Sequence, residues 1–181
     1  MYPSCGIGSG MAGAKTYRMA IRNAVRGYWK GYISVDQFRD IMWLAIEGGL
    51  TNAWFTGAAD CGIMPGELTI EERRALNEAI IKEAQWIDGF AAAIEEQRDG
   101  LLSPLFHRSD VWIGRWEGVR DQAKTMACSD QKYHWTLGGS EIACGSCLAL
   151  STQTRRGSFW HEKGILPRVH GAWYLSCKGF L

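Results

Sequence analysis

Cys144 and Cys147 are the residues whose type and spacing most clearly suggest chemistry. Two thiolates separated by two residues, with a glycine between them that allows a tight turn, can bind one metal ion through both sulfurs. A tetrahedral zinc shell needs two further Cys or His ligands. The downstream segment supplies His170 and Cys177, with His161 in reserve. The sequence therefore predicts a structural zinc site formed by the two cysteines with His170 and Cys177.

Two other interpretations of the Cys144 and Cys147 pair stay open. A redox pair of the thioredoxin type would need a strand-to-helix setting in a βαβ pattern, which we do not find in this sequence. Two ordinary cysteines without a ligand are the other alternative. If zinc is bound, a closed shell of four protein ligands leaves no open position for water, so the metal is expected to be structural.

The composition is that of a folded globular chain. It has 181 residues, 46% of them hydrophobic, with nine Trp, six Tyr and six Phe, which suits one domain or one domain with a small module. The net charge of +1 argues against a strong attraction to nucleic acid along the whole chain, although a local basic patch is compatible with it. No segment approaches the roughly 20 apolar residues of a membrane-spanning helix, and the first residues do not resemble a secretory signal.

The six cysteines do not suggest a disulfide framework. Three of them are scattered through helical sequence and the other three form the ligand-like group, whereas disulfide scaffolds are usually small and dense in cysteine. We therefore expect a soluble protein made in a reducing cytoplasm. Cys61, beside a predicted loop, is then expected to be a small buried apolar residue rather than a nucleophile.

Hydrophobic periodicity predicts a mainly α protein, with a helical domain over residues 14–128. A glycine-rich, flexible arm is expected over residues 1–13, because this composition orders at a high cost in backbone entropy. Two helices of the domain should start at capping boxes, in which a hydroxyl and a Gln or Glu three residues later satisfy backbone amides reciprocally. The hydroxyl residues of these boxes are Ser34 and Thr69.

Glycine and proline predict where the helices weaken or start. Gly48 and Gly49 should weaken or kink the second helix, and Gly89 should be a weak point of the third. The start of the fourth helix stays open between Ser103 and Ser109. Its aromatic residues at helical spacing are expected in the core rather than in a base-stacking or ligand-cage role: Trp112 and Trp116.

The first predicted helix carries a series of basic residues. They suggest a face for an anionic partner, and a solvated polar face is the alternative. The series consists of Lys15, Arg18, Arg22, Arg26 and Lys30.

The pattern changes after Cys128. Residues 129–181 are predicted to form a small Cys/His-rich module, α+β or irregular and similar to a zinc knuckle. A short strand is expected near residues 133–137. A module of this size holds a fixed shape poorly alone, and a bound metal is a common staple.

No catalytic constellation is recognisable in the sequence. His107 and His134 belong to no triad, and the glycine-rich segment over residues 6–10 lacks the lysine and the strand-helix frame of a phosphate-binding loop. We therefore expect that the protein is not an enzyme.

With these residues located, the chain resembles the phage minor head proteins of the Mu type, also called phage head morphogenesis proteins. The resemblance covers most of the chain and includes the segment Ile87 to Ile94, the helix ending near Met126, and Cys144-x-x-Cys147-Leu-Ala-Leu. The family has a second element of the form His-Pro-x-Cys-Arg-Cys downstream. Its nearest match here is Pro167-Arg-Val-His170, followed by Leu175-Ser-Cys177.

This resemblance implies a low-copy structural component of the virion, made in the host cytoplasm. Its expected partners are the phage portal or inner capsid proteins, with possible contact to packaged DNA, and its expected role is to assist head assembly or genome delivery.

Two other classes of function are weighed against this one. A nucleic-acid-binding zinc module would place basic residues of the C-terminal segment on phosphates: Arg155, Arg156, Lys163, Arg168 and Lys178. The third class is an enzyme, such as a nuclease or toxin that uses His134 or His161.

Overall fold

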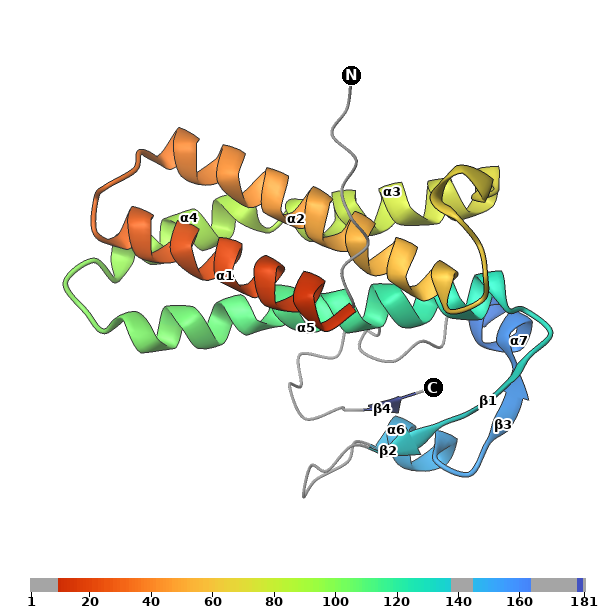
Figure 1. Ribbon diagram of the computed structural model, residues 1–181. Helices are drawn as coiled ribbons and strands as arrows, with labels where there is room; N and C mark the ends of the chain where they lie inside the picture. Colours follow the sequence, from red (N-terminus) through yellow and green to blue (C-terminus); the bar gives the residue numbers. More distant parts are fainter. Residues whose placement is uncertain (1–9, 138–144, 164–178, 181) are drawn as a thin grey trace.

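The computed structural model describes residues 10–137, 145–163 and 179–180 of the chain. Within them, five helices joined by short connections form the body of the molecule (Figure 1). They run, with one short 3-10 helix η1, as α1 Gly10–Trp29, α2 Val35–Ala59, η1 Pro65–Glu67, α3 Ile70–Ala84, α4 Ile87–Glu96 and α5 Leu102–Ala127. None of the described helices is long and apolar enough to cross a membrane.

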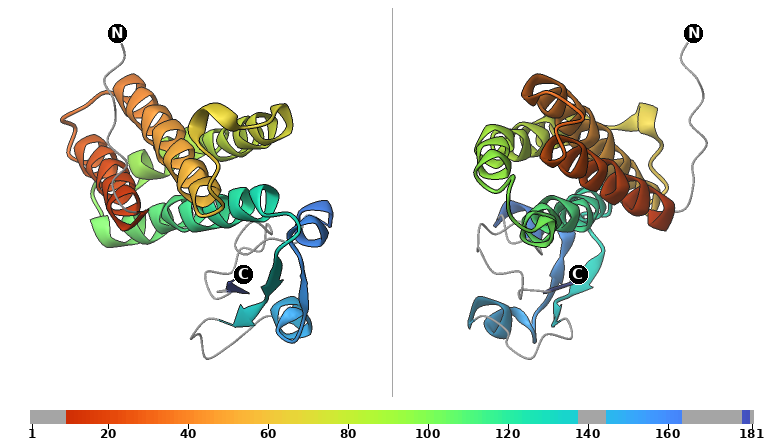
Figure 2. Two further views of the ribbon diagram at one scale, coloured as in Figure 1. Left: turned by 45° about the vertical axis from the view of Figure 1, so that its right-hand side comes forward. Right: turned by 90° about the vertical axis from the view of Figure 1, so that its left-hand side faces the viewer.

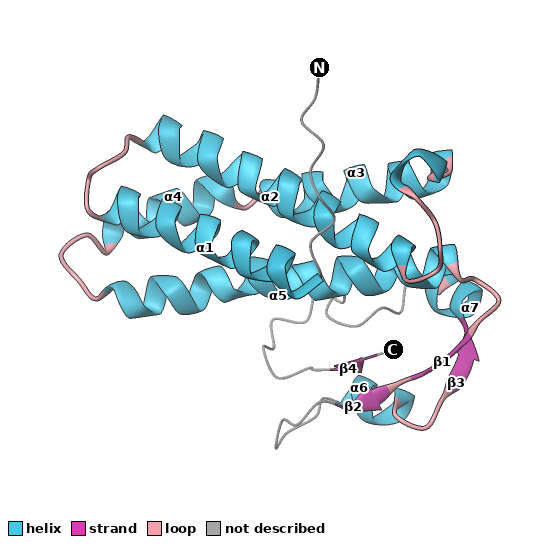
Figure 3. Ribbon diagram, viewed as in Figure 1, coloured by secondary structure: helices cyan, strands magenta, loops and turns pink. Residues whose placement is uncertain are grey.

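A small C-terminal module follows α5. It contains β1 Lys132–His134, β2 Thr136–Leu137, α6 Gly145–Leu150, β3 Thr154–Arg156, α7 Gly157–Glu162 and β4 Gly179–Phe180. β1 pairs antiparallel with β3, and β2 pairs antiparallel with β4. The module lies below the C-terminal end of α5 in both Figure 1 and Figure 2. Figure 3 shows that the body is helical and that the described strands are confined to this module, so the prediction of a mainly α protein is confirmed.

Local signals set the start of α2 and α3 as predicted. The Ser34 amide donates to the Gln37 side chain, and the Gln37 amide donates to the Ser34 hydroxyl. Thr69 and Glu72 make the same reciprocal pair of bonds. These bonds satisfy amides that have no partner within the helix, and the prediction of both capping boxes is confirmed.

Two expectations about helix boundaries are wrong, and a third boundary, which the sequence left open, is decided by the structure. α1 begins at Gly10 rather than at residue 14. The third predicted helix is divided after Ala84 rather than weakened at Gly89, and the Gln85 side chain donates to the Lys82 carbonyl where α3 ends. The last predicted helix begins at Leu102, beside Ser103, so the earlier of its two predicted starts is the one that the structure favours. Its proline falls in the first turn, where a missing N–H leaves no helical bond unmade.

Gly48 and Gly49 do not interrupt α2, which is continuous from Val35 to Ala59. Packing accounts for this difference. A Cβ built on Gly49 would lie 2.2 Å from the ring of Tyr17, so the glycine admits the aromatic side chain of α1. Gly57 admits α5 in the same way, because a Cβ there would lie 2.1 Å from the Arg120 carbonyl oxygen.

An aromatic row crosses the core and joins four helices. The Tyr28 ring of α1 stacks on Phe38 of α2 at a centroid distance of 4.9 Å, and Phe38 meets Phe90 of α4 edge-on at 6.2 Å. Phe90 in turn contacts Trp112 of α5 at 5.0 Å. Trp112 and Trp116 are both buried, as predicted for core residues.

Gly57→Ala is expected to destabilise the protein by about 1–3 kcal/mol, because its methyl group would force α2 away from the Arg120 carbonyl. Gly48→Ala is a matched control in the same helix, since nothing lies within 4 Å of a Cβ at that position. The control is expected to stabilise by about 0.5–1 kcal/mol, the usual gain at a helix interior. Urea denaturation measures both free energies of unfolding, and equal values for the two variants would contradict the close crossing.

Candidate metal-binding module

Cys147 lies in α6 and is buried, with 5% of its surface exposed. The other three predicted ligands, Cys144, His170 and Cys177, lie outside the described residues. His161, the reserve ligand, is half-buried in α7. Over the described ranges, no group of three or more His, Cys, Asp or Glu residues could hold a metal ion. The zinc site therefore stays a prediction, with one of its four ligands placed.

The module has a small core of its own. Cys147 packs there with Tyr133, Trp135 and Trp160. The two indole rings lie 5.6 Å apart between centroids, and the Trp160 indole N–H donates to the Arg155 carbonyl at 3.2 Å. Cys147 thus has a packing role in addition to any role as a ligand.

The two histidines considered for catalysis lie on different elements of the module. His134 is exposed on β1, where its Nδ1 is 2.9 Å from the hydroxyl of Thr154 on the paired strand β3. His161 lies on α7. His134 therefore has a pairing role between the two strands, and a catalytic role for His134 or His161 stays a prediction.

The module is anchored on the end of α5 through Gly157. The Gly157 amide donates to the Gln131 carbonyl and the Ser158 amide to the Ser129 carbonyl, each at 2.9 Å. A Cβ on Gly157 would lie 2.4 Å from the carbonyl oxygen of Thr125 in α5. The Tyr133 hydroxyl also reaches α5 and donates to the Lys124 carbonyl at 3.2 Å. The start of α7 can therefore sit directly against the α5 backbone because position 157 has no side chain.

A disulfide joins Cys61 to Cys128 beside this anchor, with 5.7 Å between the Cα atoms. The expectation that Cys61 is simply a small apolar residue is wrong, and so is the expectation that the scattered cysteines stay unpaired. The two residues are separated by 67 positions in the sequence. They meet because Cys61 follows the end of α2 and Cys128 ends α5, and these two helices cross.

Acidic groups collect at the same end of the body. Asp121 is buried beside Arg120, whose guanidinium donates to it at 3.0 Å, and Asp60 pairs with Lys124 at 3.7 Å. Burial raises the pKa of Asp121 above its ordinary value, and the charges of Arg120 and Lys124 oppose that rise. Burial also raises the pKa of the Tyr133 hydroxyl, with the charges of Asp60 and Asp121 adding to it.

A second polar site, which sequence reasoning missed, lies between α3 and α5. Glu83 is buried and forms an ion pair with Arg115 at 3.0 Å. The pair borders a cavity of about 170 Å³, which Lys82 and Gln122 also line. Burial raises the pKa of the Glu83 carboxyl, while the charges of Arg115 and Lys82 oppose the rise. The signal in the sequence was the position of Glu83 on the apolar side of its helix.

The Glu83 and Arg115 pair has the arrangement of a structural ion pair. Each charge offsets the desolvation cost of the other. Removal of one partner would leave the remaining charge buried and unpaired. The backbone carbonyl of Glu83 also accepts the Trp112 indole N–H at 3.1 Å, which ties α3 to α5. The Tyr17 hydroxyl, buried in the same body, has a pKa raised by burial and by the Glu83 charge.

Comparison of the chain with protein-family models, with curated proteins and with solved structures found no match. The resemblance to phage minor head proteins therefore stays a prediction from the motifs.

Replacing both Cys61 and Cys128 by Ser is expected to lower the free energy of unfolding by about 2–4 kcal/mol, because the cross-link no longer restricts the unfolded chain. Urea denaturation with and without dithiothreitol measures the effect. Reductant should bring the wild-type protein to the stability of the double variant and leave the variant unchanged. A wild-type protein insensitive to reductant and equal to the variant would contradict the disulfide.

Asp121→Asn is expected to change how stability depends on pH. Since the folded-state pKa of Asp121 is raised, the folded protein binds more protons than the unfolded chain from the ordinary value of 3.8 upward. Stability from this group therefore falls as pH rises through that interval, and the Asn variant lacks the fall. Between pH 3 and pH 7, the free energy of unfolding of the variant should increase relative to that of the wild type as the pH rises. Parallel profiles would contradict the raised pKa.

Proposed function

We propose that this protein is a structural, non-enzymatic component of a phage virion that binds the portal or inner capsid and assists head assembly or genome delivery. It is made in the host cytoplasm and then resides in the virion. The motif resemblance supports this proposal, as does a body whose described surface offers apolar side chains for a protein partner.

The observation that carries the proposal is an apolar group on the outer side of α2. Ile41, Trp43 and Leu44 are 38%, 42% and 64% exposed, and they lie within a single turn of α2. Single exposed apolar residues are ordinary, whereas several in one place mark a protein interaction site. Two of the three, Ile41 and Leu44, are three residues apart and therefore share a helix face.

Leu44→Asp is expected to weaken binding of the portal or capsid partner about tenfold or more, because a charge would have to be desolvated within an apolar contact. Met64→Asp is the matched control, since Met64 is also exposed, at 52%, but lies next to η1 rather than on α2. Co-purification of the portal and capsid proteins of the same phage with each tagged variant measures the difference. Equal recovery with both variants, or no recovery with the wild type, would argue against this interface.

We further propose that a structural zinc ion staples the C-terminal module through Cys144, Cys147, His170 and Cys177. The burial of Cys147 in the module core supports a structural position for that ligand. Zinc would supply a cross-link among segments that are distant in sequence.

Elemental analysis of the reduced, purified protein is expected to find about one zinc per chain. The double substitution Cys144→Ser and Cys147→Ser should abolish it, because two of four ligands are lost. The Cys61→Ser and Cys128→Ser variant is the control for removal of two other cysteines, and it should retain the metal. Metal-free wild-type protein would remove the zinc staple from the proposal.

A nucleic-acid-binding module remains the second candidate, and one observation favours it. Lys132 on β1 lies directly opposite Arg156 on β3, so like charges are exposed side by side on this ribbon. Two contacts argue against a nucleic-acid role for these basic residues, because they already engage the side chains. Arg156 pairs with Asp130 at 3.4 Å, and the Arg155 guanidinium lies over the Phe159 ring.

A further inference from the structure

The positive charge of the helical body is concentrated on α1 and the residues that follow it. Residues 10–34 contain five basic residues and no acidic one, whereas residues 60–100 contain ten acidic and four basic residues. The near-neutral total therefore conceals a strongly cationic helix.

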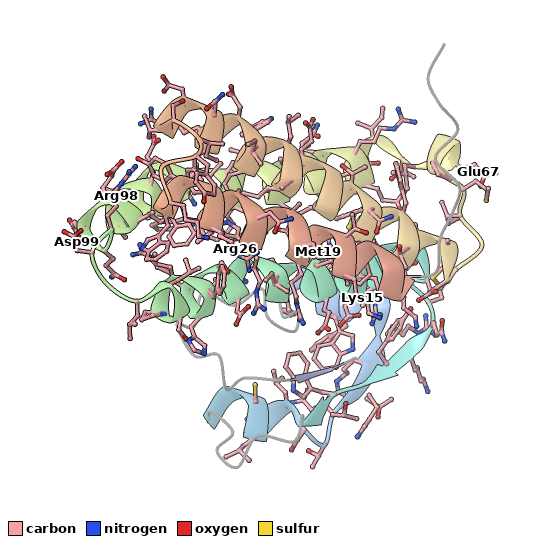
Figure 4. All side chains as sticks on the ribbon, turned by 60° about the vertical axis from the view of Figure 1, so that its left-hand side comes forward. Lys15, Met19, Arg26, Glu67, Arg98 and Asp99 are labelled. Atoms are coloured by element: carbon pink, nitrogen blue, oxygen red, sulfur yellow. A yellow bond between two sulfur atoms is a disulfide. The ribbon has the colours of Figure 1, made fainter. Side chains whose placement is uncertain are left out.

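The five basic residues of α1 and its end form one stripe, which we call the α1 stripe: Lys15, Arg18, Arg22, Arg26 and Lys30. The last four are spaced by four residues each, so neighbouring members share a helix face while the series turns gradually around α1, at intervals of about 6 Å along the axis and over about 18 Å. Four of the five are exposed and Arg22 is half-buried. Figure 4 shows Lys15 and Arg26 along this side of α1, with Met19 between them.

Contacts with aromatic rings hold part of the stripe in place. The guanidinium groups of Arg22 and Arg26 lie over the Phe106 ring of α5, at 5.4 Å and 5.6 Å from its centroid. The Lys30 ammonium lies 5.6 Å from the centroid of the Tyr32 ring. Such contacts leave the positive charge available to a further anion and reduce the side-chain freedom that binding would remove.

Asp110 is the acidic residue that neutralises part of the stripe. It forms an ion pair with Arg22 at 2.9 Å. Arg18, Arg26 and Lys30 have no ion pair to an acidic group in the described part of the chain. Arg18, Arg26 and Lys30 are therefore exposed cations without an acidic partner among the described residues.

We infer that the α1 stripe binds the phosphodiester backbone of duplex nucleic acid. Evenly spaced cations suit a regular array of phosphates, and guanidinium groups match phosphate geometry. A protein partner would be expected to find an apolar centre, but over residues 13–29 of α1, where side-chain exposure is described, Met19 is the only exposed large apolar side chain. The net negative charge of residues 60–100 would repel the same ligand and so favour its binding along α1. This surface is separate from the α2 apolar group and from the basic residues of the module, and it does not depend on the virion role.

The test uses the full chain and a fluorescein-labelled 20-base-pair DNA duplex, with binding measured by anisotropy between 50 and 200 mM salt. The test variant is Arg18→Gln, Arg26→Gln and Lys30→Gln, which keeps the Arg22 pair with Asp110. The matched control is Arg155→Gln, Arg156→Gln and Lys163→Gln, which removes three cations from the module. Circular dichroism confirms that both variants are folded.

Phosphate contacts by the four exposed members of the stripe predict a wild-type affinity that falls roughly a hundredfold across this salt range. These members are Lys15, Arg18, Arg26 and Lys30. In the test variant, the slope of log affinity against log salt should become less negative by about 2.7, or 0.9 for each lost contact. The control should keep the wild-type slope. An unchanged slope in the test variant, a loss in the control alone, or no wild-type binding at 50 mM salt would overturn the inference. Equally tight binding of labelled poly-glutamate would overturn it in favour of an acidic protein partner.

Discussion

The close crossing of α2 and α5 is the constraint on which the rest of the structure depends. Gly57 allows the α2 backbone to approach the Arg120 carbonyl of α5, where any side chain would collide. This crossing brings the ends of both helices together, so Cys61 meets Cys128. It also fixes α5 as the element against which α1, α3 and the C-terminal module all pack. A single glycine in a continuous helix thus positions both the body and the site.

The C-terminal module also depends on a glycine that allows two backbone segments to approach closely. Gly157 places the start of α7 against the backbone of α5, and the core around Trp135 and Trp160 forms beyond that contact. Cys147 belongs to this core, so it is held in a defined position relative to the helical body. A ligand held in this way suits a metal that completes a fold, which is the role we propose for zinc.

Local signals could be read from the sequence, and contacts between distant segments could not. The capping boxes at Ser34 and Thr69 involve residues three positions apart, so the sequence alone predicts them. The weakening that helix propensity predicts at Gly49 does not occur, because propensity is a local property, whereas this glycine admits a ring from another helix. The Cys61 and Cys128 pair depends on the crossing of two helices and has no local pattern. The zinc ligands share this limit, since the spacing at Cys144 and Cys147 is local but the other two ligands must come from elsewhere.

The anchoring of the module on α5 is the central claim, and hydrogen exchange of Gly157→Ala tests it most directly. The added methyl group would lie 2.4 Å from the Thr125 carbonyl oxygen, so the module should detach from the helix end. The account predicts faster exchange at the amides of Trp135 and Ser158, which bond to the Gln153 and Ser129 carbonyls, and unchanged protection at Leu50 in the α2 core. Wild-type exchange rates at the module amides of the variant would contradict it.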